Sequence, residues 1–270
     1  EIISFRGAYH GSTHGALSVS GNETKKRAFR PLLPDVRFIR FNEPEDLAQI
    51  SNKTAAVIVE TIQGDAGVRI PDYDYMQALR ARCTELGVLL ILDEIQSGIG
   101  RCGTWFAFEQ FDIVPDILCT AKALGGGLPI GAFISDQKIM QCLTEKPMLG
   151  HITTFGGNPL ACASAEACLA VIEEGNLLKE VEPKGALIES LLADESKILE
   201  IRRRGMYFAI DLASADQVMD LAGRLLKRGL ITFWFLSCPH SFRIAPPLNI
   251  SEEDLRYACK LIKEELAKIA

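Results

Sequence analysis

The sequence predicts an α/β protein with a mostly parallel sheet in a large first domain and a smaller α+β domain after it. Short, almost continuously apolar runs alternate with helix-like segments, and such runs are typical of strands that are covered on both faces. One helix-like segment lies between two of these runs, which is the order of a βαβ unit. At 270 residues the chain is long enough for one large or two modest domains.

The first part of the chain contains six predicted strands and a clear helix between two of them. The helix covers 72–87, and apolar residues at helical spacing are followed by Gly87 in the position that ends many helices. Its inward positions are Tyr75, Leu79, Cys83 and Leu86. The predicted strands are EIISF (1–5), VRFIRF (36–41), AAVIVE (55–60), VLLILDE (88–94), DILCTA (116–121) and IGAFIS (130–135).

The pattern changes after a long helix rich in small residues, which is predicted over 158–176. We expect a large domain over 1–175 and a small α+β domain over 176–270. The chain starts without a methionine, so we expect a piece of a longer protein whose N-terminal portion, including part of the large domain, is absent. The later predicted elements are helices near 184–193 and over 215–228, strands near 206–212 and over 230–236, and a C-terminal helix that Ser251 and Asp254 cap.

Composition excludes several classes of protein. Apolar content of 48% and charged content of 24% are ordinary for a globular protein, and no apolar stretch is long enough to cross a membrane. A net charge of −6 provides no basic surface, so nucleic acid is not an expected partner. The eight cysteines form no CxxC pair, which predicts reduced thiols, no metal site and a cytoplasmic location.

Two adjacent acids, Asp93 and Glu94, end the most apolar of the predicted strands. Ligands of parallel α/β sheets bind beyond the carboxyl ends of the strands, so these acids are candidate site residues. A carboxylate that is bonded only to loop amides is the ordinary alternative. A functional role requires a buried positive group opposite the carboxylate, because an unpaired interior charge is costly.

Two further segments offer matching chemistry. Lys122 follows the strand over 116–121 and precedes three glycines, and a desolvated lysine with a lowered pKa is what Schiff-base chemistry requires. Hydroxyls and glycines in 150–160 stand before a helix N-terminus, where a phosphate can bind, although the same residues also make an ordinary cap. A pyridoxal cofactor needs a lysine, a carboxylate for its ring nitrogen and donors for its phosphate.

Six motifs follow one another over essentially the whole chain: FRGAYHGST, VETIQGDAG, LDEIQSGIGRCG, PDILCTAKALGGGLPIGA, TTFGGNPLAC and FRIAPPL. In their sequence and order they resemble the motifs of the class III aminotransferases, the ornithine, acetylornithine and 4-aminobutyrate type. This resemblance implies the fold type I of pyridoxal 5′-phosphate-dependent transferases and a homodimer with shared active sites.

The resemblance also implies roles for single residues. Asp93 would pair with the cofactor's ring nitrogen, so that its positive partner is the cofactor and not a protein cation, and Gln96 would bond the phenolic oxygen. Lys122 would form the internal aldimine and then move the proton. Tyr9 would stack on the ring, and His10 beside it could contact the cofactor region or be a packed structural histidine.

Three further positions follow from the same resemblance. Thr154 would reach the phosphate in the neighbouring subunit, and Arg243 would grip a substrate carboxylate with its planar fork. The chain reads ETIQGDAG where the family has EPxQGEGG, so that Thr61 replaces proline and Asp65 replaces glutamate. Asp65 is one methylene shorter, so the family's switch between this acid and Arg243 is not expected to carry over unchanged.

The predicted activity is the transfer of an amino group from an ω-amine or amino acid to a 2-oxo acid such as 2-oxoglutarate. Acetylornithine, ornithine and 4-aminobutyrate all remain open as donors. One alternative is a class III relative with an aminomutase, racemase or decarboxylase outcome. Another is an inactive fragment that acts only in binding.

Overall fold

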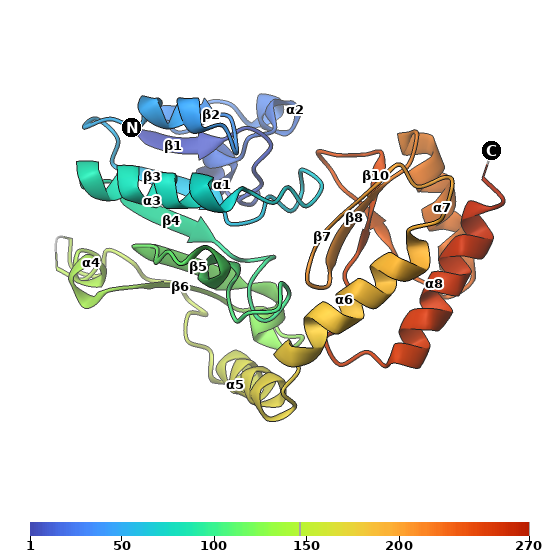
Figure 1. The fold of residues 1–270 in the computed structure, drawn as a ribbon. Coiled ribbons are helices and arrows are strands. Elements are labelled where there is room, and N and C mark those ends of the chain that lie inside the picture. The colour runs from blue at the N-terminus through green and yellow to red at the C-terminus, as the bar shows by residue number, and fades with distance from the viewer. Residues whose placement is uncertain (146, 270) are drawn as a thin grey trace.

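The computed structural model describes residues 1–145 and 147–269, which form two β-sheets with helices packed around each (Figure 1). The N-terminus lies at one end of the first sheet, and the C-terminus lies beside the last helix at the far side of the second sheet. Segments from both sheets meet in the middle, and the candidate site described below lies there.

The first sheet has six strands in the order β2-β1-β3-β4-β5-β6. The first five are mutually parallel, and β6 runs antiparallel to β5, so the predicted mostly parallel sheet is confirmed. Each predicted strand is present: β1 (Ile2–Phe5), β2 (Val36–Ile39), β3 (Ala56–Glu60), β4 (Leu89–Asp93), β5 (Ile117–Ala121) and β6 (Gly131–Ser135).

The helix predicted over 72–87 is α3 (Tyr73–Leu86). Gly87 ends it with φ 66°, a left-handed conformation that glycine adopts without steric cost. The predicted inward residues Tyr75, Leu79 and Cys83 are buried against the sheet. The other helices of this part are α1 (His14–Val19), α2 (Glu23–Lys26), α4 (Gln137–Gln141) and α5 (Pro159–Glu174), with short 3₁₀ turns at 27–29, 44–49, 107–111 and 122–125.

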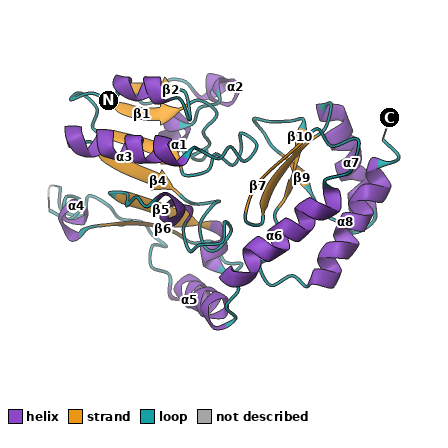
Figure 2. Ribbon diagram, in the orientation of Figure 1, coloured by secondary structure: helices purple, strands orange, loops and turns teal. Residues whose placement is uncertain are grey.

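The second sheet has four antiparallel strands in the order β7-β8-β10-β9 (Figure 2). These strands are β7 (Glu200–Arg204), β8 (Tyr207–Asp211), β9 (Phe233–Trp234) and β10 (Ser241–Ile244). Three helices pack on one side of the sheet and enclose the apolar core with it: α6 (Leu178–Leu192), α7 (Ala215–Lys227) and α8 (Glu252–Leu266). The predicted cap of α8 is present, because Ser251 Oγ accepts from the Asp254 amide at 3.0 Å.

The second half differs from prediction in three elements. Helix α6 begins before Pro183 and runs through it, whereas the prediction started after it. The strand predicted over 230–236 shrinks to the two residues of β9. Strand β7 was missed because four of its five residues are charged, so it lacks the apolar alternation that marks a strand. The division at residue 175 stays a prediction.

Two other expectations concern composition. All eight cysteines are free thiols, as predicted. Within the described residues, none of the helices combines the length and the apolar character that a membrane span requires.

Candidate active site

A cavity of about 320 Å³ lies where the two sheets meet. From the first sheet it takes residues that follow β4 and β5, among them Gln96 and Lys122. From the second it takes Tyr207 of β8 and Arg243 of β10. Polar side chains far apart in the sequence therefore face one space beyond the carboxyl ends of parallel strands, which is where open α/β sheets bind ligands.

Lys122 is the first residue after β5 and has φ 47°, a left-handed conformation that is strained for a side chain of its kind. Its side chain is exposed because it faces the open cavity. The surrounding protein nevertheless desolvates the ammonium and lowers its pKa, against the opposing charges of Asp93 and Glu60. Lys122 is thus a strained lysine that deprotonates more easily than an ordinary surface lysine, as the sequence predicted for a Schiff-base residue.

Asp93 ends β4 and meets a protein side chain. His10 Nδ1 lies 2.8 Å from Asp93 Oδ2, and only 2% and 7% of these two side chains are exposed. An ionised carboxylate only accepts, so Nδ1 carries the hydrogen. The other oxygen, Oδ1, accepts from the Ile95 amide at 3.0 Å. A protein imidazole thus also meets Asp93, the carboxylate keeps acceptor sites for a further donor, and its pairing with a cofactor's ring nitrogen stays a prediction.

Glu60 is a site residue that the sequence analysis missed. It ends β3 and is the register partner of Asp93 on β4, so the two acids lie side by side. It accepts from the Tyr9 amide at 2.8 Å and from the Gly64 amide at 2.9 Å. Burial raises the pKa of Glu60 to about 7. The signal was present, because AAVIVE ends an apolar strand in an acid just as VLLILDE does.

Gln96 is held by Tyr207, whose hydroxyl donates to Oε1 at 2.8 Å. That bond leaves the amide nitrogen of Gln96 free to donate into the cavity that Gln96 lines. A side chain at Gly64 would collide with this pair, because a Cβ there would lie 2.1 Å from the Tyr207 hydroxyl and 3.1 Å from Gln96 Oε1. Glycine at position 64 is therefore what lets Tyr207 and Gln96 approach the loop after β3.

Arg243 lies across the cavity from Lys122 and is flanked by aromatic rings. Its guanidinium carbon is 5.8 Å from the Phe233 ring centroid and 6.0 Å from that of Phe235. Asp65 is buried and occupied elsewhere, since Oδ1 accepts from the Leu236 amide at 2.9 Å and Oδ2 from the Ser237 hydroxyl at 2.8 Å. The described contacts thus bind Asp65 to a loop, and the altered switch with Arg243 stays a prediction.

Arg101 also lines the cavity and was not identified from the sequence. Its guanidinium donates to the Pro246 carbonyl at 2.6 Å and the Met206 carbonyl at 3.2 Å. Desolvation lowers the pKa of this arginine. These contacts tie the loop after β4 to the start of β8 and the end of β10, which lie at the same end of the second sheet, and so position the two walls of the cavity.

Of the predicted site residues, Gln96, Lys122 and Arg243 line the cavity, whereas Tyr9 and Thr154, like His10, Asp65 and Asp93, are not among its lining residues. The Tyr9 ring lies 5.6 Å from Lys25 Nζ, and its predicted stacking on a cofactor stays a prediction. Thr154 lies in an exposed turn before α5, and its contact with a neighbouring subunit also stays a prediction. Asn158 Oδ1 caps α5 by accepting from the amides of Leu160 and Ala161. Two amides at the N-terminus of this helix are therefore bonded in an ordinary cap.

The triple glycine after Lys122 approaches a helix. A Cβ at Gly126 would lie 3.0 Å from both the Ser164 carbonyl oxygen and the Cys168 Cβ of α5. Ser164 Oγ donates to the Gly125 carbonyl at 2.8 Å. The glycines therefore let the segment after Lys122 pack directly on α5, which fixes where the lysine stands.

Glu94 faces away from Asp93 and has only protein partners. It accepts from the hydroxyls of Thr61 at 2.7 Å and Ser97 at 2.9 Å. It also accepts from the amides of Ala107 and Phe108, both at 2.8 Å. Burial raises the pKa of Glu94, and the four donors counter this effect. These contacts give Glu94 a structural role and separate it from Asp93 as a candidate site residue.

The mostly parallel sheet, the lysine after β5 and the acid at the end of β4 match the fold type I of the pyridoxal phosphate-dependent transferases. The chain belongs to the aminotransferase class III family, whose model matches residues 1–266. The predicted family and fold class are confirmed.

Solved structures of other members are closely similar in fold. The ornithine aminotransferase of Toxoplasma gondii is 32% identical with a TM-score of 0.91, and the match covers 100% of this chain and 64% of that one. A Bacillus anthracis aminotransferase is 25% identical with a TM-score of 0.93, covering 100% and 69%. A transaminase of the marine bacterium Virgibacillus is 26% identical with a TM-score of 0.90, covering 99% and 68%. One structure of the Toxoplasma enzyme has partial occupancy of PLP at its active site.

The residues present fit pyridoxal 5′-phosphate, the cofactor that goes with this family. Lys122 would meet its aldehyde, Asp93 its ring nitrogen and Gln96 its phenolic oxygen. Two buried polar atoms, His10 Nε2 and Thr120 Oγ1, have no hydrogen-bond partner among the described residues. Because buried polar atoms in proteins are rarely left without a partner, they mark this region as one that a polar ligand completes.

Proposed function

We propose that the protein is an aminotransferase that moves an amino group from an ω-amine or amino acid to a 2-oxo acid. The observation that carries this proposal is that Lys122 and Arg243, from different sheets, line one cavity, and that the His10–Asp93 pair lies at the end of the strand β4 next to β5. The chain spans 64% of the Toxoplasma ornithine aminotransferase, so the proposal concerns the full-length protein that contains it.

Each group of the site has a task in this reaction. Bound pyridoxal phosphate supplies an aldehyde and a ring that withdraws electrons from the reacting carbon. Lys122 Nζ, with its lowered pKa, would hold the aldehyde of the cofactor and would supply the base that takes up and returns a proton at the reacting carbon. Asp93 would hold positive charge at the ring nitrogen, and its bond to His10 Nδ1 keeps the carboxylate in place. Gln96 would bond the phenolic oxygen through its amide nitrogen, because its Oε1 already accepts from Tyr207.

The substrate side of the proposal rests on Arg243. The Arg243 guanidinium lines the cavity beside two aromatic rings and forms no ion pair with an acidic side chain among the described residues, so it suits a carboxylate by bidentate bonding. We propose donors of the acetylornithine, ornithine or 4-aminobutyrate type and 2-oxoglutarate as acceptor. The similarity to ornithine aminotransferase supports this choice.

We also propose a homodimer in the cytoplasm. The segment that contains Thr154 exposes several large apolar side chains, and such patches mark contact surfaces. The exposed fractions are 81% for Met148, 65% for Leu149, 72% for Ile152, 80% for Phe155 and 69% for Leu160. Sedimentation equilibrium of the full-length protein should give twice the subunit mass, and a monomer would contradict this part of the proposal.

Replacement of the lysine tests the function directly. In the full-length protein Lys122→Ala should lower turnover on the order of 10⁴-fold, the scale seen when a central catalytic group is removed. The assay is a panel of amino donors with 2-oxoglutarate, with cofactor absorbance read in parallel. Lys227→Ala, at the exposed end of α7, is the matched control and should retain full activity. Normal turnover by Lys122→Ala would refute the proposed function.

A further inference from the structure

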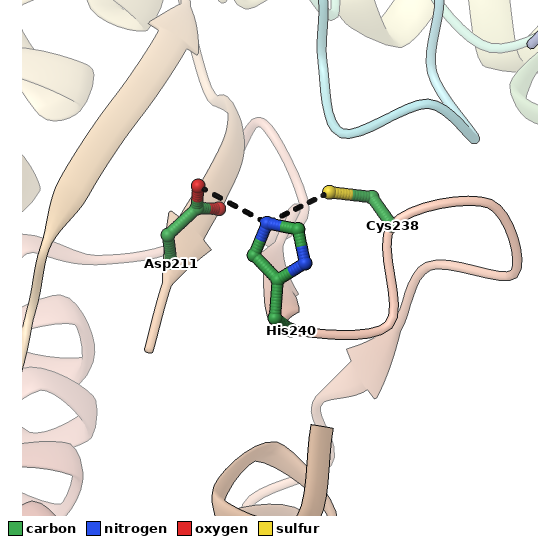
Figure 3. A group of neighbouring side chains, drawn as sticks. All are labelled: Asp211, Cys238 and His240. Atoms are coloured by element: carbon green, nitrogen blue, oxygen red, sulfur yellow. Dashed lines mark hydrogen bonds and ion pairs between the residues drawn. The ribbon is translucent and has the colours of Figure 1, made fainter. Parts of the chain in front are cut away.

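Three side chains meet at one end of the two central strands of the second sheet, outside the active cavity. Asp211 ends β8, and Cys238 and His240 belong to the loop before β10 (Figure 3). His240 Nε2 lies 3.6 Å from Asp211 Oδ2 and 3.6 Å from Cys238 Sγ. One ligand atom from each residue lies within 4.8 Å of the others. None of the three lines the active cavity, and the proposed aminotransferase reaction gives them no task.

The backbone fixes this arrangement. Cys238 opens a tight turn in which the Ser241 amide donates to the Cys238 carbonyl at 3.1 Å, with Pro239 in the second position that such turns favour. The Leu212 amide donates to the His240 carbonyl at 2.9 Å, which ties His240 to the residue after Asp211. Ser241 and Asp211 are register partners in the sheet. All three side chains therefore project from hydrogen-bonded, rigid backbone.

Two of the three ligand separations match a tetrahedral metal ion, and the third pair, Asp211 and Cys238, lies within 4.8 Å. With the usual zinc bond lengths to sulfur, nitrogen and oxygen, neighbouring ligand atoms lie about 3.4 to 3.6 Å apart. The two measured separations from His240 Nε2 have this value. Thiolate, imidazole and carboxylate are all zinc ligands. We propose that Asp211, Cys238 and His240 form a Zn²⁺-binding site.

The same geometry argues against a catalytic thiol. In a nucleophile–base pair with an orienting acid, the imidazole meets the thiol through one nitrogen and the acid through the other. Here a single nitrogen, His240 Nε2, faces both Cys238 Sγ and Asp211 Oδ2 (Figure 3). When one imidazole nitrogen, a thiol and a carboxylate all point at the same space, they are arranged as ligands around a metal ion.

Arg202 places a positive charge beside Asp211, one of the proposed metal ligands. It donates to Asp211 Oδ2 at 2.8 Å and to Oδ1 at 2.6 Å, and Ser241 also donates to Oδ1. A carboxylate oxygen has more than one lone pair, and carboxylates that bind metal ions are commonly held by such outer hydrogen bonds. Arg202 thus orients Asp211, while loss of the Cys238 proton on binding supplies the negative charge. His240 is about half exposed, so water can complete the coordination.

Zinc binding by the full-length, cofactor-loaded protein after removal of adventitious metal tests the site. Equilibrium dialysis should give one tightly bound Zn²⁺ per subunit. Cys238→Ser and the solvent-facing His240→Ala should each weaken binding more than about tenfold, since even changes to outer partners have effects of that size. Cys142→Ser, which removes an exposed thiol elsewhere, is the matched control and should bind as the parent does.

The absorption spectrum of bound Co²⁺ tests whether Cys238 supplies a thiolate ligand. Co²⁺ added in place of Zn²⁺ should produce a thiolate-to-metal absorption band, read as the difference from the zinc-loaded protein so that cofactor absorbance cancels. The band should be absent in Cys238→Ser and present in Cys142→Ser. Failure of the parent to bind Zn²⁺, or binding that Cys238→Ser and His240→Ala leave unchanged, would overturn the proposal.

Discussion

Asp93 and Glu94 are adjacent carboxylates at the end of β4, and they differ in the number of hydrogen-bond donors around them. On one side, Glu94 receives four hydrogen bonds from two hydroxyls and two amides, so its acceptor capacity is filled. On the other, Asp93 meets one ionisable imidazole and one amide, next to Glu60 and near Lys122. A carboxylate with a full set of fixed donors holds the fold together, whereas one with remaining capacity can serve a ligand.

The first consequence of this contrast is a large loss of stability on the Glu94 side. Glu94→Ala leaves four buried donors without an acceptor, so unfolding should become easier by about 3 kcal/mol, since each such group has a penalty of its own. Urea unfolding of the variant and its parent measures this loss. The exposed Glu45→Ala control should stay within about 0.5 kcal/mol of the parent. A similarly small change in Glu94→Ala would contradict the structural role.

A smaller effect concerns pH on the Asp93 side. Burial raises the pKa of Glu60 from 4.5 to about 7, so the folded protein binds this proton more tightly than the unfolded chain. The resulting stability is complete below pH 4.5 and is lost as the pH rises through about 7. Glu60→Gln removes this titration, so the parent should lose on the order of 2–3 kcal/mol relative to the variant over that range. If the free energy of unfolding changed with pH in the same way in both proteins, the pKa of Glu60 would not be raised.

The smallest expected effect is on substrate binding by Arg243, which lines the cavity. Arg243→Lys keeps the charge but loses the planar fork, so KM for the carboxylate substrate should rise about tenfold with kcat little changed. Steady-state kinetics of the full-length protein separates the two constants, and Arg256→Lys on the exposed face of α8 is the control. A fall in kcat with KM unchanged would place Arg243 in the chemical step instead of substrate binding.

Sequence reasoning succeeded where an element has a local signal. The six strands of the first sheet are apolar runs, and Asp93 and Lys122 stand directly after such runs. It failed where partners come from distant segments. The meeting of Tyr207 with Gln96 depends on how the two sheets pack. Those of His10 with Asp93 and of Cys238 with Asp211 depend on which distant segments lie together at one sheet, and no local spacing encodes either. Strand β7 was lost for a different reason, because its charged residues pair with neighbouring acids instead of forming an apolar face.

The most direct test of the division between the two carboxylates is a paired measurement on Asp93→Asn and Glu94→Gln in the full-length protein. Asp93→Asn should lower turnover on the order of 10²-fold or more, as loss of a charged group at a reacting centre does, while the free energy of unfolding stays within about 1 kcal/mol of the parent. Glu94→Gln should do the opposite, with reduced stability and nearly normal turnover in the folded fraction. Normal turnover by Asp93→Asn would contradict the assignment of this acid to the active site.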